Sequence, residues 1–323
     1  MTNRTPVLLW TDGPGPYIDA IARAGLDGRV QVETLPRAEK PSEAHRQTAE
    51  AMLAWGAPAG LLPTMKSLRW AQALTAGVEG WLALPDLPPG LTLTCARGTH
   101  RESMPENILG ALFHLTKPYA ACVADQKQST WTRRLATPLN GQTLGILGLG
   151  AIGQEVARLA TALGMTVIGT KRNPVPVPGL APGLVEVFAP DRTDEVLARS
   201  DFVLLLLPAT PRTENFINAE RLAKMKPTAW LLNFGRGHLI DDAALIAAAK
   251  EKRIAGAVLD VFRQEPLPAS HPFWTSEGII VLPHIGGGHP KRDQVVARLF
   301  VDNLERFLDG KPLRETVDRA AGY

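Results

Sequence analysis

The sequence is short of cysteine, net charge and long apolar runs, and each shortage excludes a class of protein. Two cysteines, Cys95 and Cys122, cannot build a disulfide framework in 323 residues, and no Cys/His cluster has zinc-site spacing. The longest apolar run, in "DFVLLLLP" at 201–208, is far below the roughly 20 residues of a membrane-spanning helix. The net charge is only +3, so a basic feature that matters must be local.

The same shortages set expectations about surroundings and partners. The opening "MTNRTPVLLW" has no long apolar segment behind Arg4 and no small-residue cleavage site, so we read no signal peptide. We therefore expect a cytoplasmic protein with reduced thiols, no bound metal, and neither nucleic acid nor membrane as partner. A hydrophobic content of 45% with 21% charged residues is globular, and the length predicts two domains.

From about residue 140 onward, apolar runs alternate with helical or loop segments. Strands that are apolar throughout and separated by helices indicate a parallel sheet covered on both faces. We assign residues 102–290 to a dinucleotide-binding domain of the Rossmann type, with a doubly wound parallel sheet. The predicted strands are "TLGILG", "TVIGT", "VEVFA", "DFVLLLLP", "AWLLNF", "GAVLDVF" and "GIIVLP".

The first hundred residues repeat this alternation more weakly. "PVLLW", "VQVETL" and "LRWAQAL" predict strands, while "YIDAIARAG" and the stretch 42–56 predict helices. A long helix should follow within 103–117, opened by a capping box of Ser103 and Glu106. The final helix, 291–310, could return the chain to the first unit, which would make a discontinuous domain of 1–101 and 291–323.

The stretch "GLGAIG" supplies a phosphate-binding pattern through Gly148, Gly150 and Gly153. The pattern alone is weak, but here it follows a predicted strand and opens a helix. The first glycine makes the tight turn, the second admits a pyrophosphate, and the third allows close helix–strand packing. Backbone N–H groups of Ala151 and Ile152, at the helix start, would face the phosphate charge.

The strand "TVIGT" ends in bases where an NAD-binding protein usually has an acid. About 20 residues beyond the glycine loop an Asp or Glu commonly accepts hydrogen bonds from the ribose. This chain has Thr170, Lys171 and Arg172 there. A guanidinium could bind a 2′-phosphate that a carboxylate would repel, so we expect NADP(H), with NAD(H) still possible. The alternative is that the two bases merely face water.

Three chemically distinct side chains follow three successive predicted strands. Arg236 comes after "AWLLNF", Glu265 after "GAVLDVF" and His284 after "GIIVLP". Because ligands of doubly wound sheets bind beyond the carboxyl ends of the strands, these residues should share one site. Arg236 suits a substrate carboxylate, His284 can exchange a proton with a carbonyl oxygen, and Glu265 would hold the imidazole. The predicted reaction interconverts a 2-oxo acid and a 2-hydroxy acid.

Several stretches together resemble the D-isomer-specific 2-hydroxyacid dehydrogenase family. They are specific in combination and order, and they cover most of the chain: "SLRWAQALTAGVEGW", "SMPENILGALFHL", "GLGAIG", "LLLLPATPRTENFI", "MKPTAWLLNFGRGHLIDDAAL", "GAVLDVFRQEPLP" and "LPHIGG". The resemblance implies a smaller, flavodoxin-like substrate domain, an active site between the domains, and homodimers formed largely through the cofactor domain. It places the family's catalytic Arg, Glu and His on Arg236, Glu265 and His284.

The resemblance also implies roles for residues that spacing alone does not single out. Asp260 matches the position that faces the nicotinamide carboxamide. Ala76 and Gly77 match the loop whose backbone N–H groups hold the substrate carboxylate, together with Arg236 and His284. Pro208 and Thr210 match the loop beside the adenosine. Without the family match, Asp260 could be a strand-end cap and Gly77 only a turn.

Subgroup features favour the NADPH-preferring glyoxylate/hydroxypyruvate reductases. "GRGHLIDDAAL" and the basic pair resemble that group, whereas Glu265 argues against a formate dehydrogenase. Two departures, "GGGHPKR" after His284 and Met104-Pro105 before Glu106, leave the substrate-side shape open. The alternatives are an NAD(H)-dependent enzyme for a bulkier or phosphorylated acid, and a dinucleotide-sensing binding protein similar to the family's corepressors. The particular acid and the physiological direction stay open.

Overall fold

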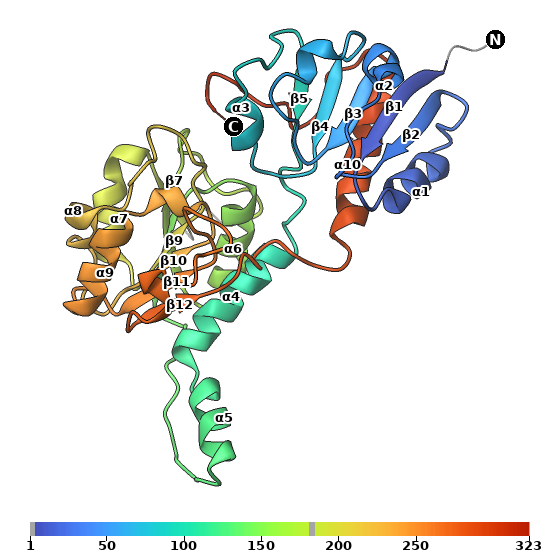
Figure 1. Cartoon of the computed structure of the whole chain (residues 1–323). Helices are drawn as coiled ribbons and strands as arrows, with labels where there is room; N and C mark the ends of the chain where they lie inside the picture. Colours follow the sequence, from blue (N-terminus) through green and yellow to red (C-terminus); the bar gives the residue numbers. More distant parts are fainter. Residues whose placement is uncertain (1–3, 181–184, 323) are drawn as a thin grey trace. The chain divides into compact units, whose positions relative to one another are not determined.

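The chain forms two compact units. The computed structural model describes residues 4–180 and 185–322, and divides the chain into Met1–Thr99 with His289–Tyr323, and His100–Gly288 (Figure 1). These boundaries differ by two residues from the predicted 101/102 and 290/291. The smaller unit is therefore discontinuous in sequence. Among the described residues, no helix combines the length and apolar character needed to cross a membrane.

The larger unit is built on a seven-stranded sheet in which every neighbouring pair is parallel. Its order, β12-β11-β10-β9-β6-β7-β8, is the Rossmann order with one further strand at the edge. The apolar runs of the sequence become strands because both of their faces are covered. The strands are β6 Thr143–Leu147, β7 Thr166–Thr170, β8 Val185–Phe188, β9 Phe202–Leu205, β10 Trp230–Asn233, β11 Gly256–Leu259 and β12 Ile279–Val281.

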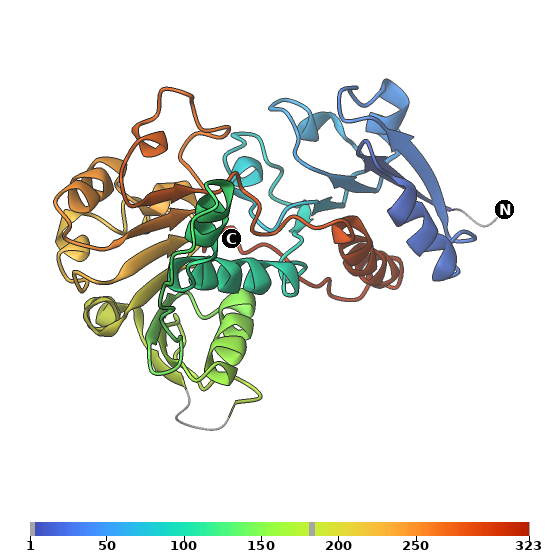
Figure 2. The ribbon, with the colours of Figure 1, turned by 90° about the horizontal axis from the view of Figure 1, so that it is seen from below.

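Two apolar cores lie on the two faces of this sheet. One packs Leu144, Ile146 and Leu204 against α4 (Ser103–Thr116) and α6 (Ala151–Ala162). The other packs residues such as Leu147 and Val203 against the opposite helices, which are α7 Thr193–Arg199, α8 Ala219–Leu222 and α9 Asp242–Lys250. Helices on both sides of the sheet can be followed in Figure 2. This confirms the predicted doubly wound architecture.

The smaller unit contains a five-stranded parallel sheet of order β2-β1-β3-β4-β5, the flavodoxin-like order. Helix α10 (Arg292–Leu308) packs on it through Phe300, whose ring stacks on Trp70 at 5.4 Å. Its other elements are β1 Thr5–Trp10, α1 Gly15–Arg23, β2 Val30–Leu35, α2 Glu43–Thr48, β3 Ala51–Ala54, β4 Trp70–Ala73, α3 Glu79–Leu82 and β5 Thr92–Thr94.

Two local expectations were wrong. The helix predicted over 42–56 ends at Thr48, and Ala51–Ala54 form a strand between β1 and β4. All four strand residues are buried, because pairing in the middle of the sheet outweighs their helix propensity. The predicted capping box does not form either: α4 begins at Ser103, and the Ser103 hydroxyl donates to the Gly287 carbonyl at 3.2 Å.

A hydrogen-bonded polar network lies inside the smaller unit. Trp70 Nε1 donates to Thr94 Oγ1 at 2.8 Å, and Thr94 donates to Gln72 Oε1 at 2.7 Å. Asn303 of α10 donates to the same Gln72 oxygen at 3.1 Å and exchanges two hydrogen bonds with the Arg314 backbone. The network joins two strands, α10 and the C-terminal segment.

Candidate active site

The glycine loop joins β6 to α6 with very little space around two of its glycines. Gly148 has φ of +110°, and a Cβ there would lie 2.8 Å from the Leu206 carbonyl oxygen. A Cβ on Gly153 would lie 2.5 Å from the Gly148 carbonyl oxygen, so the helix packs directly on the turn. Around Gly150, in contrast, a Cβ would meet no atom within 4 Å. The open side of the loop is therefore at Gly150.

The residues at this opening fit a pyrophosphate. Gly150 is the N-cap of α6 and has no side chain, so no side chain caps the N–H groups of the first turn, which contains Ala151 and Ile152. The first turn also carries no acid. Unshared N–H groups and the positive end of the helix dipole favour an anion at this position.

The three residues predicted to read the ribose lie at the end of β7, beside the glycine loop. The Thr170 carbonyl accepts hydrogen bonds from the N–H groups of Gly148 and Leu149, at 3.2 and 2.9 Å. The Thr170 side chain is in a residue only 4% exposed, Lys171 is half-buried and Arg172 is exposed. The two bases thus follow the end of β7, next to the residue that receives the glycine-loop N–H groups.

The loop after β9 is shaped by a threonine that the sequence did not single out. Thr213 Oγ1 donates to the Pro208 carbonyl at 2.7 Å and accepts from the Thr210 N–H at 2.8 Å. Pro208 and Thr210, predicted to lie beside the adenosine, are therefore held in one turn by Thr213. A Thr three residues after Thr210, in a Pro-rich loop, was the available signal.

Arg236 follows β10 in a loop fixed by Asn233, the last residue of that strand. Asn233 Nδ2 donates to the Arg236 carbonyl at 2.9 Å, and Asn233 Oδ1 accepts from the Gly235 N–H at 3.1 Å. Gly237 approaches the next loop so closely that a Cβ would lie 2.0 Å from the Phe262 carbonyl carbon. The loops after β10 and β11 are thus in direct contact.

Glu265 and His284 form a hydrogen-bonded pair. Glu265 Oε2 lies 2.6 Å from His284 Nδ1, and Glu265 Oε1 accepts the Phe262 backbone N–H at 2.9 Å. With an ionised carboxylate as partner, Nδ1 donates, and the other ring nitrogen is left for proton exchange. The His284 side chain is 53% exposed, so that nitrogen can be reached within this unit.

Asp260 lies one residue beyond β11 and is 1% exposed. Its two carboxylate oxygens accept the backbone N–H groups of Ile285 at 2.8 Å and Gly286 at 3.0 Å. Burial raises the pKa of Asp260, and these two N–H groups act against that rise. Each carboxylate oxygen still has a lone pair that could accept a hydrogen bond from a carboxamide. That contact stays a prediction.

Ala76 and Gly77, the predicted carboxylate loop, belong to the smaller unit. They follow β4, where Thr75 Oγ1 donates to the Gly77 carbonyl at 2.5 Å. The guanidinium of Arg292 donates to the carbonyl of Leu74, just before this turn. The loop is thus fixed from within its own unit, and its role in binding stays a prediction.

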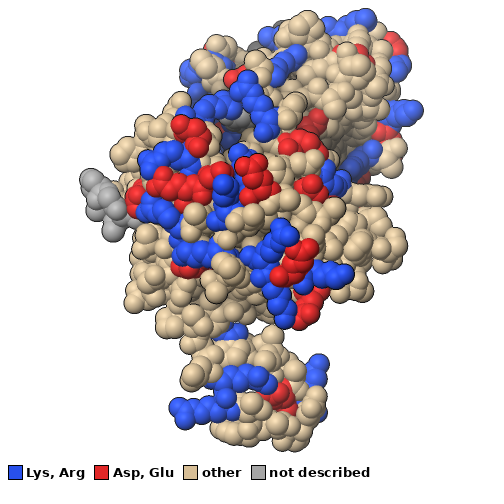
Figure 3. All heavy atoms as spheres, turned by 90° about the vertical axis from the view of Figure 1, so that its left-hand side faces the viewer, with Lys and Arg blue, Asp and Glu red and all other residues tan. Residues whose placement is uncertain are grey.

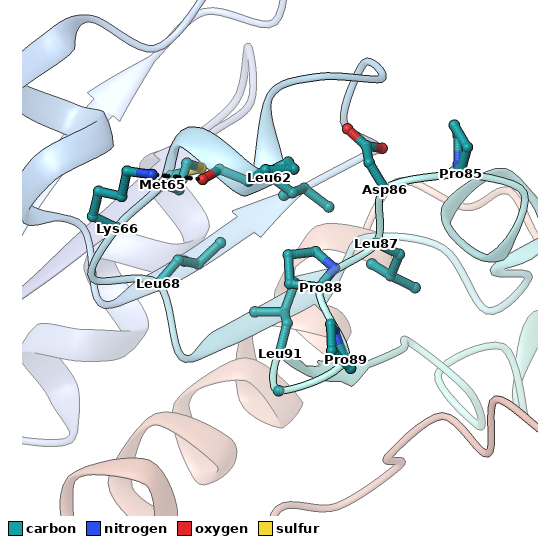
Figure 4. A pocket seen from close by; sticks show the side chains of 12 residues that line it. Leu62, Met65, Lys66, Leu68, Pro85, Asp86, Leu87, Pro88, Pro89 and Leu91 are labelled. Atoms are coloured by element: carbon teal, nitrogen blue, oxygen red, sulfur yellow. Dashed lines mark hydrogen bonds between the residues drawn. The ribbon is translucent and has the colours of Figure 1, made fainter.

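A hollow and mixed surface charges lie elsewhere in the described parts of the chain. A hollow of about 690 Å³ in the smaller unit is lined by 62–68 and 85–91, the segments that lead into β4 and β5 (Figure 4). It is therefore at the amino ends of those strands, away from the turn at Ala76. On the face in Figure 3, basic and acidic side chains intermingle. Among the described residues, no cluster of His, Cys, Asp and Glu could hold a metal ion.

Comparisons with known proteins agree with this geometry. Residues 109–286 match the model of the D-isomer specific 2-hydroxyacid dehydrogenase, NAD binding domain. The glycerate dehydrogenase of Methylorubrum extorquens is 36% identical over 233 residues, covering 69% of this chain and 70% of its own.

Solved structures are similar over nearly the whole chain. A D-isomer specific 2-hydroxyacid dehydrogenase from Xanthobacter autotrophicus Py2, in complex with NADPH and MES, has a TM-score of 0.88 and 27% identity, covering 99% of this chain and 100% of that one. An NADPH-dependent glyoxylate/hydroxypyruvate reductase from Sinorhizobium meliloti, in complex with NADP and sulfate, has a TM-score of 0.83 and 28% identity, covering 99% and 100%. The chain belongs to the D-isomer-specific 2-hydroxyacid dehydrogenase family and is an NAD(P)-binding oxidoreductase.

Proposed function

We propose that the protein reduces a small 2-oxo acid of the glyoxylate or hydroxypyruvate type to the D-2-hydroxy acid, with NADPH as preferred cofactor. The observation that carries this proposal is the 2.6 Å pair of Glu265 and His284 at strand ends of the sheet that bears the glycine loop. A proton donor and a dinucleotide site on one sheet edge suit a reaction that moves a hydride and a proton.

Each side chain has a separate task. When bound, the nicotinamide cofactor supplies the hydride. His284 gives a proton to the oxygen of the substrate carbonyl, and takes it back in the reverse direction. Glu265 orients the ring through Nδ1 and stabilises its protonated form. Arg236 binds the substrate carboxylate. Asp260 would face the carboxamide.

The preference for NADPH rests on the chain's own residues. Lys171 and Arg172 follow β7 directly, no acid lies in the first turn of α6, and Thr170 closes the strand. A 2′-phosphate would find a guanidinium and an ammonium there, whereas a ribose hydroxyl would lack its usual carboxylate. Two neighbouring structures named above hold NADPH or NADP, which supports the proposal.

A matrix of initial rates tests the proposal. Purified protein would be mixed with NADPH or NADH and with glyoxylate, hydroxypyruvate, pyruvate or phenylpyruvate. We expect the highest kcat/KM with NADPH and either glyoxylate or hydroxypyruvate. Turnover with NADH and phenylpyruvate only would favour the alternative, an NAD(H)-dependent enzyme for a bulkier acid. If no combination is turned over, the reductase proposal is wrong.

We also propose that the protein is a homodimer, formed through the segment around α5 (Tyr119–Lys127). Figure 1 shows this segment standing off from the sheet of its own unit. None of the residues of α5 is buried, and Tyr119, Val123, Trp131 and Leu135 are between 54% and 97% exposed. Large exposed apolar side chains of this kind favour an interface. Light scattering should give twice the chain mass, and Trp131→Asp should lower it.

A cytoplasmic location is proposed on the state of the thiols. Cys95 and Cys122 are both free, and a reducing compartment keeps them so. Fractionation of cells that produce the protein, followed by detection with an antibody, tests this location. Recovery with the envelope or the medium would contradict it.

A further inference from the structure

The loop that begins with His284 is gripped from two sides. On one side, the Asp260 carboxylate accepts the N–H groups of Ile285 and Gly286, as described above. On the other, Asn107 Nδ2 donates to the carbonyls of the same two residues, at 3.3 and 3.0 Å. The backbone N–H and C=O groups of two consecutive residues are thus all hydrogen-bonded to side chains.

A second side chain of α4 extends this grip by one residue. Ser103 Oγ donates to the Gly287 carbonyl at 3.2 Å. Ser103 and Asn107 are one helical turn apart, so they present neighbouring donors to the loop. The loop carbonyls face the first turns of α4, where the helix dipole is positive and favours them.

Neighbouring atoms pack closely on two glycines of this loop. A Cβ on Gly286 would lie 2.6 Å from Asp260 Oδ2 and 2.9 Å from Phe234 Cδ1. A Cβ on Gly287 would lie 3.1 Å from the His100 ring. A side chain at Gly286 would therefore displace its neighbours, and one at Gly287 would press on the His100 ring.

His284 itself has a backbone conformation that needs external support. Its φ of +52° lies in the left-handed region, which costs a non-glycine residue roughly 1 kcal/mol or more. The same conformation directs Nδ1 to within 2.6 Å of Glu265 Oε2. A loop released from α4 would gain by returning to negative φ, and the imidazole would then turn away from Glu265.

We propose that Asn107 is a positioning residue for His284. It acts through the backbone of Ile285 and Gly286 and contacts no reacting atom. The proposal rests on the proposed function, because the proton transfer by His284 is the step that it serves. Two carbonyl acceptors require the NH₂ end of the amide, so a carboxylate at the same place has the wrong polarity.

Three variants separate the lost donor from other effects. Asn107→Ala removes the donor, and Asn107→Asp replaces it with a group that repels both carbonyls. Glu106→Gln/Asn107→Asp restores the net charge of the first turn, since Glu106 is exposed on the same helix. Gly110→Ala is the matched control on α4, because a Cβ there meets no atom within 4 Å.

Steady-state kinetics give the first readout. Loss of these hydrogen bonds should lower kcat about tenfold in Asn107→Ala and further in Asn107→Asp, with KM for NADPH within about twofold of wild type. The double variant should stay as slow as Asn107→Asp, and Gly110→Ala should match wild type. If the double variant recovers wild-type kcat, a charge effect replaces the positioning role and the proposal is overturned.

Two further readouts do not depend on turnover. Amide hydrogen exchange at Ile285 and Gly286 should be about tenfold faster in Asn107→Ala, and the downfield proton resonance of the His284–Glu265 hydrogen bond should weaken. Unchanged exchange and an unchanged resonance would overturn the proposal, whatever the activity. Faster exchange with wild-type kcat would overturn it as well. If the wild type reduces no 2-oxo acid, the proposed function fails, and these two readouts still decide whether Asn107 positions His284.

Discussion

Buried polar residues at strand ends of the seven-stranded sheet hydrogen-bond to the backbone of nearby loops, whereas those of the five-stranded sheet hydrogen-bond to one another and to α10. Thr170 and Asn233 are the last residues of β7 and β10, and Asp260 follows β11 directly. In the smaller unit, Gln72 lies within β4 and is bonded to Thr94 and Asn303, all three fully buried.

The difference shows two uses of a buried polar group. At strand ends, Asn233 and Asp260 hydrogen-bond to the backbone of loops that carry Arg236 and His284. Inside the smaller unit, Gln72, Thr94 and Asn303 hydrogen-bond to one another, and these bonds join the sheet to α10. Such a network fixes one packing arrangement, because any other arrangement leaves buried groups unpaired. We therefore expect changes at strand ends to act on catalysis, and changes in the network to act on stability.

The largest effect should follow from removing the proposed proton donor. His284→Ala should lower kcat with a 2-oxo acid by about 10³-fold, since a general acid contributes roughly 10² to 10⁴. NADPH binding and the urea midpoint should stay near wild type. Stopped-flow kinetics measure kcat, fluorescence titration measures NADPH binding, and urea unfolding gives the midpoint. His114→Ala, at an exposed position of α4, is the control. A change of less than about tenfold in kcat would remove His284 from the proposed role.

The next effect concerns the cofactor. Arg172→Asp should lower kcat/KM for NADPH about 100-fold, because a charge-assisted bond is lost and a repulsion is added. With NADH the value should change little. Arg298→Asp, an exposed arginine on α10, is the control. An unchanged ratio of NADPH to NADH would return Lys171 and Arg172 to ordinary surface charge.

A stability change should appear when the interior network is cut. Asn303→Ala leaves Gln72 Oε1 and the Arg314 backbone without this partner and should lower the free energy of unfolding by about 2 to 3 kcal/mol. The Kd for NADPH should not change, because the glycine loop lies in the other unit. Urea unfolding and NADPH titration measure both, with Arg298→Ala as control on the same helix. Weaker NADPH binding at unchanged stability would contradict the division of tasks.

The smallest effect compares one thiol from each unit. Cys95 is fully buried, and burial raises the pKa of its thiol, while Cys122 is exposed on α5. A raised pKa leaves less thiolate at a given pH. Alkylation of Cys95 therefore requires a higher pH and also a local opening of the fold that exposes the sulfur. At about pH 8, mass spectrometry of Trp131→Asp, in which the proposed interface at α5 is open, should show iodoacetamide on Cys122 alone, and on both thiols after unfolding. Equal rates would mean that the C-terminal segment, bonded to Cys95 through Glu315, opens readily.

Part of the fold could be read from the sequence because it depends on local pattern. Strands such as β9 and β11 are apolar throughout, and few other structures bury such a run. The stretch Ala51–Ala54 has the same burial but lies beside a helical pattern, so it was assigned to a helix. Only its two neighbouring strands, β1 and β4, make it a strand.

The site divides in the same way. Gly148, Arg236, Glu265 and His284 stand out because each has its chemistry at a strand end, which spacing along the chain identifies. Asn107 and Thr213 do not stand out, because they act by holding backbone. The capping box predicted at Ser103 was wrong, because its hydroxyl donates to the Gly287 carbonyl and does not cap α4.

The sequence by itself therefore determined the kind of sheet, and it led to the residues that we propose carry the chemistry. Only the tertiary structure decided what holds them. The bonds from α4 to the His284 loop join residues 178, 179 and 184 positions apart. At such separations no local pattern marks the partner, and the contact exists only in the folded unit. The chemistry of His284 is thus local in origin, and its orientation is a property of the folded unit.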